Sequence, residues 1–411
     1  MMDLLTRRKF LIASGVTGAA GLAAGAITLP LKEIMGTAGE IPPEARILVI
    51  VTLYGGNDGL NTVIPFADPA YQKARPELAY KANEVLKLDE TTGLNPAMKG
   101  FHRMFGEKRL AIVRSVGYPE ADRSHFRSMD IWHTAEPKNP GHTGWIGRWL
   151  DTVGGDPRLA ISFEPVLPPL LAGARSAGAT VGSNGLRLPR SYNVKTLAAL
   201  GTAVDGESPM QARAASCFRD LVGVDELIKE AKEYAEEVKN EQGRGTGTGG
   251  QTALDNQLNL VAQCVEAKVA TRVFSVSLGG FDTHADEKQP HSALLGILDR
   301  GVTAFLDRMA KSEQGKKVVV AVYSEFGRRV KANASDGTDH GAASDVFLVG
   351  QRVNGGLYGE PPNLTKLDGG GDIKYSTDFR TIYASVLDRL LIADPAQVLS
   401  GWAQSLDKML K

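Results

Sequence analysis

Short apolar runs followed by glycine and then by polar residues recur along this 411-residue chain, and they constrain its fold more than any other feature. Five runs rich in β-branched residues are nearly continuous in apolar side chains, which is typical of strands buried on both faces. The strands that this pattern predicts are 47–53, 110–115, 273–278, 318–323 and 346–349.

Helices are predicted where apolar residues recur every three to four positions. The segments are 225–241, 255–268, 294–309 and 378–391, the last with Ser376 and Thr377 as candidate caps. Strands that alternate with such helices indicate an α/β fold with a mostly parallel sheet.

Two segments interrupt this pattern. The proline- and glycine-rich stretch 157–208 has no clear period, and we expect it to be an insertion. The run 243–250 contains mostly glycine and no residue that could anchor a core, which predicts a flexible loop.

Residues able to bind a metal or move a proton gather at the ends of the predicted strands. They are Asp58 after the first strand, Arg123 and Ser124 after the second, Asp282 and His284 after the third, Glu325 and Arg328 after the fourth, and His340 just before the fifth. Ligands of open α/β sheets bind in the crevice outside the carboxyl ends of the strands. We therefore expect these loops to converge on one site.

The metal ligands expected in this set are Asp58, Asp282, His284, Glu325 and His340. Carboxylate oxygens and imidazole nitrogens without a thiolate suit a divalent cation such as Zn, Mn, Mg or Ca. Asp339 could instead orient the imidazole of its neighbour from outside the metal's ligand shell. The alternative is a structural polar cluster, in which residues 57–59 form a simple turn.

Ser124 has two interpretations, because it precedes a segment whose apolar residues could face a core. It is either the N-cap of a helix or a nucleophile at the helix N-terminus, where backbone N–H groups favour an anionic ester. Arg123 and Arg328 are planar donors that could clamp an oxyanion, although a surface ion pair is the ordinary role of either.

The N-terminus is predicted to be an export signal, residues 1–38. Arg7 and Arg8 precede an uncharged, glycine-diluted stretch from 10 to 31, and the arginine pair followed by Phe-Leu resembles a twin-arginine signal. We expect the twin-arginine translocase as a partner during export, and a periplasmic or extracellular location for the body 39–411, with no stable membrane span. The alternative is an uncleaved signal anchor, because the stretch is long enough to cross a bilayer.

Charge and cysteine content exclude several other classes. The 47 Lys and Arg residues balance 47 Asp and Glu residues, so no global field draws the chain onto nucleic acid. Cys217 and Cys264 are too few for a zinc-finger spacing or a disulfide framework; we expect structural thiols, with a single pairing as the alternative.

Several motifs together resemble one family. They are the twin-arginine leader, Gly-Gly-Asn-Asp-Gly-Leu-Asn at 55–61, Arg-Ser-His-Phe at 123–126, Gly-Trp-Ile-Gly-Arg at 144–148, Gly-Phe-Asp-Thr-His at 280–284, Ser-Glu-Phe-Gly-Arg at 324–328 and Asp-His-Gly at 339–341. This set resembles the family named domain of unknown function 1501, which is related to the alkaline phosphatase and sulfatase superfamily.

The resemblance implies an α/β/α sandwich with three layers, with metal ligands on strand-end loops and a nucleophile that opens a helix. It implies that Ser124 matches the nucleophile position. The metal-ligand positions would be matched by Asp58, Asp282, His284, Glu325 and His340.

Two functions follow from these expectations. The first is an exported metal-dependent hydrolase or transferase that acts on phosphate or sulfate esters, so that an anionic ester is the expected substrate. The second is a non-catalytic binding or surface-assembly protein that keeps the sandwich. Phe326 favours the second, because the superfamily normally has histidine there.

Overall fold

The computed structural model describes residues 27–29, 31–164, 167–181, 253–406 and 408–411. The predicted export signal lies mostly outside these residues, as do the predicted helix 225–241, the predicted loop 243–250 and Cys217. The chain divides into two compact units: 42–140, 252–266 and 272–411 form the larger, and the remaining segments form the smaller.

The central sheet of the larger unit contains the five predicted strands within one residue or two of the expected bounds. They are β2 (Ile47–Leu53), β6 (Leu110–Gly117), β9 (Val273–Leu278), β10 (Val318–Ser324) and β11 (Ser344–Val349). The strand order is β9-β2-β10-β11-β6-β12, where β12 is Gly356–Tyr358, and β13 (Thr377–Asp378) also pairs with β6. Only β11 runs against its neighbours, so this sheet is mostly parallel, as predicted.

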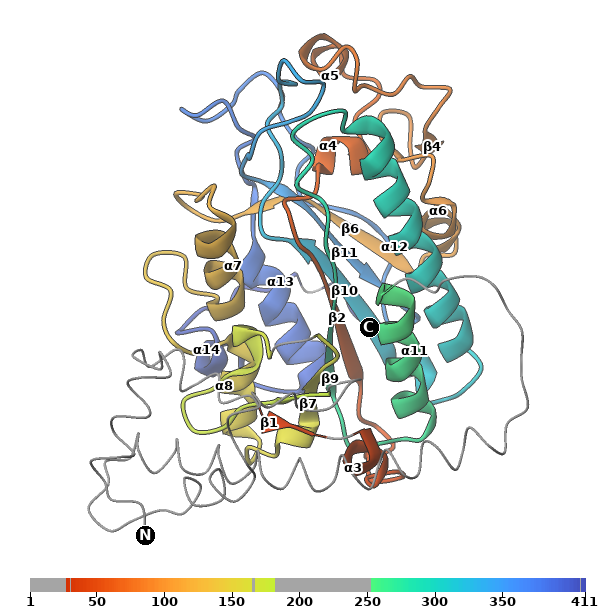
Figure 1. The fold of residues 1–411 in the computed structure, drawn as a ribbon, viewed down its shortest axis with the longest axis vertical. Helices are drawn as coiled ribbons and strands as arrows, with labels where there is room; N and C mark the ends of the chain where they lie inside the picture. The colour runs from red at the N-terminus through yellow and green to blue at the C-terminus, as the bar shows by residue number, and fades with distance from the viewer. Residues whose placement is uncertain (1–26, 30, 165–166, 182–252, 407) are drawn as a thin grey trace, which may run out of the picture. The chain divides into compact units, whose positions relative to one another are not determined.

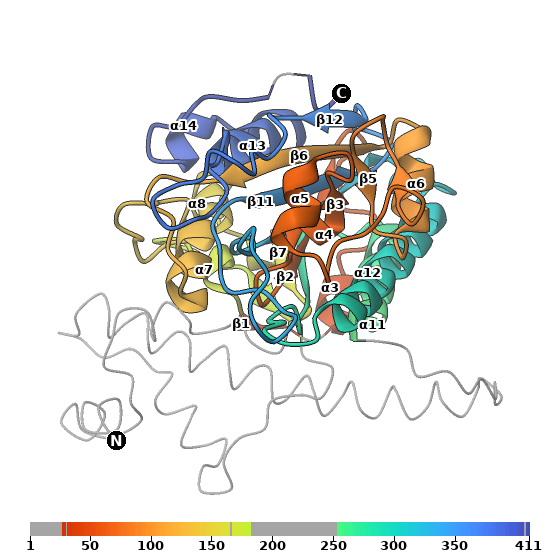
Figure 2. The ribbon, with the colours of Figure 1, turned by 90° about the horizontal axis from the view of Figure 1, so that it is seen from above.

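Helices cover both faces of this sheet (Figures 1 and 2). One layer contains α6 (Lys99–Gly106), α11 (Ala253–Glu266) and α12 (Lys288–Met309), and the other contains α7 (His125–Thr134), α13 (Phe379–Val386) and α14 (Pro395–Val398). Phe101 packs edge-on against Phe347, while Trp132 stacks on Tyr323 with centroids 4.8 Å apart. The three-layer α/β/α sandwich is therefore confirmed.

The core explains why sequence periodicity located these elements. Every residue of β2 and of β10 is buried, as expected for parallel strands that are covered on both faces. The last predicted helix is α13 continued by a π-helical segment, Leu387–Leu391. Its cap is Asp378, whose carboxylate accepts from the Arg380 amide at 3.0 Å, rather than Ser376 or Thr377, because only Asp378 directly precedes the first helical turn.

Short elements make up the rest of the larger unit, most of them between β2 and α6. They are α4 (Gly59–Thr62), β3 (Val63–Ile64), α5 (Pro69–Ala74), β4 (Leu86–Lys87), β5 (Gly93–Leu94) and, before β10, the 3-10 turn η3 (Gly315–Lys317). The strands β3, β5 and β4 form a small antiparallel sheet. Two-residue strands have too little pattern to be predicted from sequence.

The smaller unit contains the described part of the predicted insertion. Its elements are β1 (Ile27–Thr28), α3 (Leu31–Met35), α8 (Trp145–Thr152), η1 (Pro157–Leu159), β7 (Ala160–Ser162), η2 (Pro169–Leu171) and β8 (Ala179–Thr180), with β1, β8 and β7 paired in parallel. A Cβ on Gly147 would come within 2.1 Å of the Ala172 backbone. The Gly-Trp-Ile-Gly-Arg motif therefore serves close packing of α8.

Candidate functional site

Three imidazoles and one carboxylate meet at the carboxyl end of the central sheet. Asp282 Oδ1 lies 3.0 Å from His284 Nε2, 3.1 Å from His340 Nε2 and 3.5 Å from His125 Nε2. The Nε2 atoms of His284 and His340 are themselves 3.0 Å apart. We call His125, Asp282, His284 and His340 the His–Asp cluster.

Strand register brings these loops to the same edge. Leu53 pairs with Leu278 on one side and with Ser324 on the other, so β9, β2 and β10 end level with one another. His340 lies in the segment that leads into the antiparallel strand β11 at that edge, and α7 begins there after β6. The predicted convergence of the loops is confirmed by the hydrogen bonds that join them.

Two glycines allow the loops to approach this closely. Gly55 and Gly56 have φ angles of +117° and +71°. A Cβ on Gly55 would lie 2.5 Å from the Asp282 amide nitrogen, and one on Gly56 would lie 2.3 Å from the ring of Phe326. Only glycine fits both the conformation and the space.

Arg328 ties the loops together. Its buried guanidinium donates to the carbonyls of Gly55, Gly56 (2.7 Å), Phe281 (3.0 Å) and Thr338 (2.9 Å), and to Asp282 Oδ1 at 2.7 Å. All three guanidinium nitrogens are thus bonded to protein acceptors. In this structure Arg328 acts as an anchor of the site rather than as an exposed clamp.

Glu325 lies behind His125 instead of beside the other cluster residues. Its buried Oε1 accepts from the Gly55 amide at 2.9 Å and lies 2.8 Å from His125 Nδ1. A proton on Nδ1 satisfies this contact and leaves the Nε2 lone pair facing Asp282, and His125 Nε2 is buried without a hydrogen bond. Metal-binding histidines are commonly held by a carboxylate in this way.

His340, like His125, is held through its Nδ1 atom, but by a backbone carbonyl instead of a carboxylate. Its Nδ1 lies 2.8 Å from the Arg123 carbonyl, and a carbonyl only accepts, so Nδ1 carries a proton and Nε2 points into the cluster. Phe326 packs against His125 and His340, with ring centroids 4.9 and 4.8 Å apart. Asp339 lies 3.5 Å from His284 Nδ1, so it accompanies His284 rather than His340.

The charge on Asp282 is strongly favoured. Burial by itself would raise the pKa of this half-exposed carboxyl group, but the hydrogen bond and positive charge of Arg328, together with the contact to His340, outweigh burial and lower the pKa to about 2. Asp282 is therefore an ionised carboxylate at neutral pH.

This arrangement fits a divalent cation. Zn–N bonds of about 2.0–2.1 Å in a tetrahedral site place ligand atoms about 3.3 Å apart, close to the spacing of the cluster atoms. Two imidazole nitrogens at 3.0 Å also require a proton or a cation between them. His125, Asp282 and His340 have ligand atoms within 4.8 Å of one another, so among the described residues these three side chains form a group that could hold a metal ion.

Ser124 begins α7 but does not cap it through its side chain. It has extended backbone angles, it is exposed, and its side chain makes no capping hydrogen bond. Its amide donates to Asp122 Oδ1 at 2.7 Å. Arg123 pairs with the buried carboxylate of Asp372, through Nε at 2.8 Å and also through Nη2.

Asp58 lies in a separate buried network. Its Oδ2 accepts from Arg75 Nη1 at 2.5 Å, and both side chains are fully buried. Asp58 Oδ1 and Glu287 Oε1 have no other donor, so one proton shared by the two carboxyl groups satisfies both. The Thr338 hydroxyl donates to Glu287 Oε2 at 2.6 Å, and His291 Nε2 lies 2.9 Å from Asn57 Oδ1.

The structure therefore brings together Asp282, His284 and His340 of the predicted ligands, places Glu325 behind the cluster and gives Asp58 another partner. Sequence reasoning missed His125 as a site residue. The sequence does contain a signal for His125, because it directly follows Ser124 in the Arg-Ser-His-Phe motif after a predicted strand. The nucleophile hypothesis used only the serine of this motif.

A comparison with known protein families finds a match in the second half of the chain. Residues 203–402 match the family model described as protein of unknown function, DUF1501. The DUF1501 match includes Asp282, His284, Glu325, Arg328 and His340, whereas Ser124 and His125 precede it. No curated protein is significantly similar in sequence.

Solved structures resemble the chain only distantly. A protein in the alkaline phosphatase superfamily from Vibrio parahaemolyticus is 11% identical, with a TM-score of 0.42 over 100% of this chain and 80% of that one. The lipoteichoic acid synthase LtaP from Listeria monocytogenes is 11% identical, with a TM-score of 0.39 over 91% and 80%. The C-terminal periplasmic domain of EcEptC from Escherichia coli, in complex with Zn, is 8% identical, with a TM-score of 0.37 over 78% and 76%.

Two other findings bear on the sequence predictions. Within the described residues, no helix is both long and apolar enough to cross a membrane. Cys264 is a free buried thiol, and its burial raises the pKa to about 12.

Proposed function

We propose that this protein is an exported, metal-dependent hydrolase or transferase that acts on phosphate or sulfate esters. The observation that carries the proposal is the His–Asp cluster, in which the Nε2 atoms of three imidazoles lie within 3.5 Å of Asp282 Oδ1. His125, Asp282, His284 and His340 would hold the cation. When bound there, a divalent cation would polarise an ester oxygen and offset the negative charge that develops in the reaction.

The chain's own residues would prepare this site before a substrate arrives. Glu325 and the Arg123 carbonyl fix the Nδ1 protons of His125 and His340, which leaves both Nε2 atoms free to bind. Arg328 keeps Asp282 ionised and holds the loop that carries it. A preorganised site of this kind loses little free energy to rearrangement on binding.

Ser124 would supply the attacking oxygen. Its hydroxyl is exposed and makes no cap, and it directly precedes a ligand of the cluster. Backbone N–H groups of the first turn of α7 would bind the anionic oxygens of the ester. Attack by Ser124 Oγ would form a bond to phosphorus or sulfur and break the bond to the ester oxygen, and the serine proton would pass to that oxygen so that it leaves as the alcohol. Water or a second alcohol would then take the phosphoryl or sulfuryl group and return a proton to the serine oxygen.

The test measures metal content and turnover on the full chain purified after export. We expect a divalent metal by elemental analysis and hydrolysis of at least one of p-nitrophenyl phosphate, bis(p-nitrophenyl) phosphate and p-nitrophenyl sulfate. His340→Ala should lose both metal and activity. The control His102→Ala, whose ring is on α6 and contacts the Lys87 carbonyl, should lose neither.

Ser124→Ala separates the nucleophile from the metal site. We expect it to retain metal while turnover falls by a factor of about 10³ or more. Full turnover in this variant would leave water as the attacking group. Metal content without turnover of any ester would favour the non-catalytic binding protein, and wild-type protein that takes up no metal would overturn the proposal.

A further inference from the structure

Basic residues gather at the end of the central sheet that is opposite the His–Asp cluster. The strands are level there, because Ile47 of β2 pairs with Val318 of β10, and Leu110 of β6 pairs with Val349, the last residue of antiparallel β11. The cations in the four positions before β2, β6, β9 and β10 and in the four positions after β11 are Arg46, Lys108, Arg109, Arg272, Lys316, Lys317 and Arg352. We call these residues the basic rim.

Carboxylates offset only part of this charge. The same positions contain two acidic residues, Glu44 and Glu107, whereas the whole chain has 47 acidic and 47 basic residues. Glu107 pairs with Arg109 at 3.0 Å, and Glu313, one position outside the defined range, pairs with Lys316 at 2.5 Å. The basic rim therefore has a positive excess in a chain whose formal net charge is +0.

Two arginines of the basic rim donate to backbone carbonyls. Arg272 donates to the carbonyls of Arg46 at 2.7 Å and Leu390 at 2.9 Å, and Arg46 donates to the carbonyl of Arg389. A carbonyl accepts a hydrogen bond but carries no net charge, so these contacts fix the side chains without neutralising them. Burial lowers the pKa of the Arg46 guanidinium, and the nearby positive charges of Arg352 and Arg389 lower it further. The fold thus holds like charges close together.

An exposed apolar side chain lies beside the basic rim. The carbonyls that accept from Arg46 and Arg272 belong to Arg389 and Leu390, and Ile392 follows them at the end of the π-helical segment. Ile392 is 71% exposed and has a φ of +55°. A β-branched residue rarely adopts this left-handed conformation, and glycine or asparagine is the usual residue where a helix ends in it. The chain therefore presents an apolar side chain to solvent where a smaller or polar residue would fit better.

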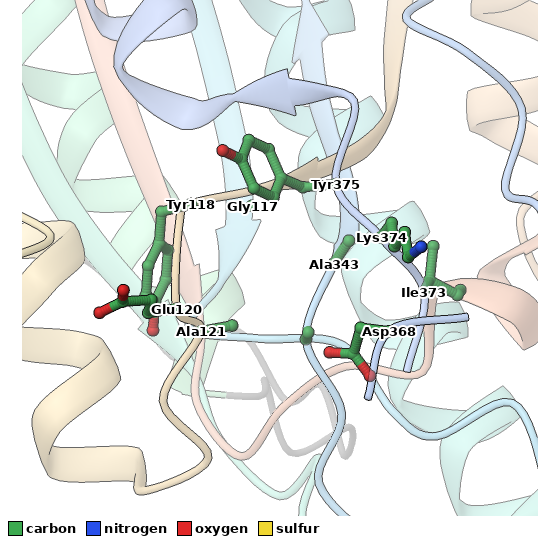
Figure 3. Close-up of a pocket in the computed structure, with 10 residues that line it drawn as sticks. Gly117, Tyr118, Glu120, Ala121, Ala343, Asp368, Ile373, Lys374 and Tyr375 are labelled. Atoms are coloured by element: carbon green, nitrogen blue, oxygen red, sulfur yellow. The ribbon is translucent and has the colours of Figure 1, made fainter. Parts of the chain in front are cut away.

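The carboxyl ends of the strands present a different surface. The pocket in Figure 3, of about 530 Å³, lies at that end, because Gly117 is the last residue of β6 and Ala343 directly precedes β11. Among the described residues that line it, Glu120 and Asp368 are acidic and Lys374 is basic. The positive excess therefore belongs to the amino ends of the strands and not to this pocket.

The dimensions of the basic rim favour a broad partner over a small anion. Neighbouring strands are about 4.8 Å apart, so the rim spans about 19 Å from β9 to β6. An anionic lipid bilayer presents many negative headgroups in one plane, and its interface also accommodates an apolar side chain such as Ile392. A polynucleotide matches the charge of the rim but offers no apolar layer for the isoleucine.

We infer that the basic rim and Ile392 form a docking surface for an anionic lipid bilayer. The choice of a bilayer rests on the exported location in the proposed function, whereas the binding itself requires no turnover. Because β2 has seven residues of about 3.3 Å each, docking would hold the His–Asp cluster about 20 Å or more from the headgroups. The protein would then act on an ester that arrives from solution rather than on a lipid of the bilayer that holds it.

The test is cosedimentation of the full chain, purified after export, with lipid vesicles. One vesicle preparation contains phosphatidylcholine alone, and the other also contains about 30% phosphatidylglycerol, which is anionic. We expect binding only to the anionic vesicles in about 0.05 M NaCl, and loss of that binding in about 0.5 M NaCl, because salt screens exposed charges.

A pair of matched double variants tests the basic rim. Lys108→Gln combined with Lys317→Gln should weaken binding to the anionic vesicles about tenfold or more, because basic residues near the bilayer surface contribute separately. The control is Lys331→Gln combined with Lys366→Gln, which removes the same charge from exposed lysines in the loops that follow β10 and β12. The control should bind as wild type does.

Ile392→Asn tests the apolar contact. Asparagine adopts the left-handed conformation more readily than isoleucine, so this variant should be at least as stable as wild type while vesicle binding falls about fivefold or more. Ile392→Met keeps an apolar side chain and should retain binding. Weaker binding by a stable Ile392→Asn protein could then not be attributed to misfolding.

The outcomes separate this inference from the proposed function. Equal binding to both kinds of vesicle, equal loss in the two double variants, or unchanged binding by Ile392→Asn would overturn the docking surface. Tighter binding to a DNA duplex of about 20 base pairs than to the vesicles would assign the basic rim to a polynucleotide instead. Ester turnover without vesicle binding would overturn the docking surface and leave the proposed function intact, whereas vesicle binding without metal or turnover would do the reverse.

Discussion

At the scale of single residues, Glu287 is the buried group with the clearest thermodynamic consequence. Burial raises the pKa of this carboxyl group, and the nearby negative charge of Asp58 raises it further. Asp58 itself keeps its charge because Arg75 outweighs the cost of burial, and burial lowers the pKa of His291 to about 4, so that His291 is neutral. The folded protein therefore holds a proton on Glu287 that the unfolded chain releases near pH 4.5.

The sign of the pH dependence follows from this difference. Above about pH 4.5 the folded state binds more protons than the unfolded state, so the free energy of unfolding falls as pH rises toward the raised pKa. Glu287→Gln keeps a neutral, hydrogen-bonding group and removes this dependence. We expect it to lose less stability than wild type between pH 6 and about pH 9, measured by urea unfolding. Exposed Glu90→Gln is the control, and parallel pH profiles for wild type and Glu287→Gln would contradict the assignment.

The sequence could predict a residue of the candidate site only where the residue's place depends on its position at the end of a strand. Asp282, His284 and His340 were found because each stands at a strand end, and the register of the sheet brings strand ends together. The pairing of Asp58 with Arg75 was not predictable, because these side chains meet through the small elements α4 and α5, which have almost no sequence period. Glu325 was found as a site residue, but sequence spacing could not show that its carboxylate faces His125 Nδ1 from behind.

At the scale of secondary structure, local pattern predicted the central strands and the helices that cover them. Complete burial produces continuous apolar runs in β2 and β10, and one-sided burial produces the apolar stripe of α12. The loops after the strands differ, because close approach between backbones determines their conformation. Gly55 shows this best, since its positive φ and its contact with the Asp282 amide depend on a loop that is more than 220 residues away in sequence.

Gly55→Ala is expected to destabilise the protein by more than about 2 kcal/mol, because the new Cβ combines a left-handed backbone with a steric clash. It should also reduce metal content, since Asp282 would be displaced. The matched control is Gly106→Ala in α6, where a Cβ meets nothing within 4 Å and should be neutral or stabilising by up to about 1 kcal/mol. Chemical denaturation measures both variants, and equal stabilities would show that the loop can move aside.

At the scale of the whole molecule, the fold class followed from the alternation of strands and helices, but the strand order did not. The pairing β9-β2-β10-β11-β6 places strands that are far apart in sequence side by side, and only long-range packing decides such an order. The smaller unit combines residues 157–164 and 167–181 of the stretch expected to be an insertion with β1, α3 and α8, which lie outside that stretch. Short strands and 3-10 turns carry little pattern from which a separate unit could be predicted.

The predicted export concerns the whole chain and can be tested on it. If the leader is a twin-arginine signal, a receptor reads Arg7 and Arg8 as a pair, so replacing both with lysine keeps the charge but removes the recognition. We expect the Arg7→Lys, Arg8→Lys variant to accumulate in the cytoplasm, measured by cell fractionation. Replacing Lys32 with arginine, a change of the same kind outside the arginine pair, should leave export unchanged. A general secretory signal depends on positive charge alone. Normal export of the double variant would therefore assign the leader to that pathway, in which case the chain would cross the membrane unfolded and would assemble its His–Asp cluster only afterwards.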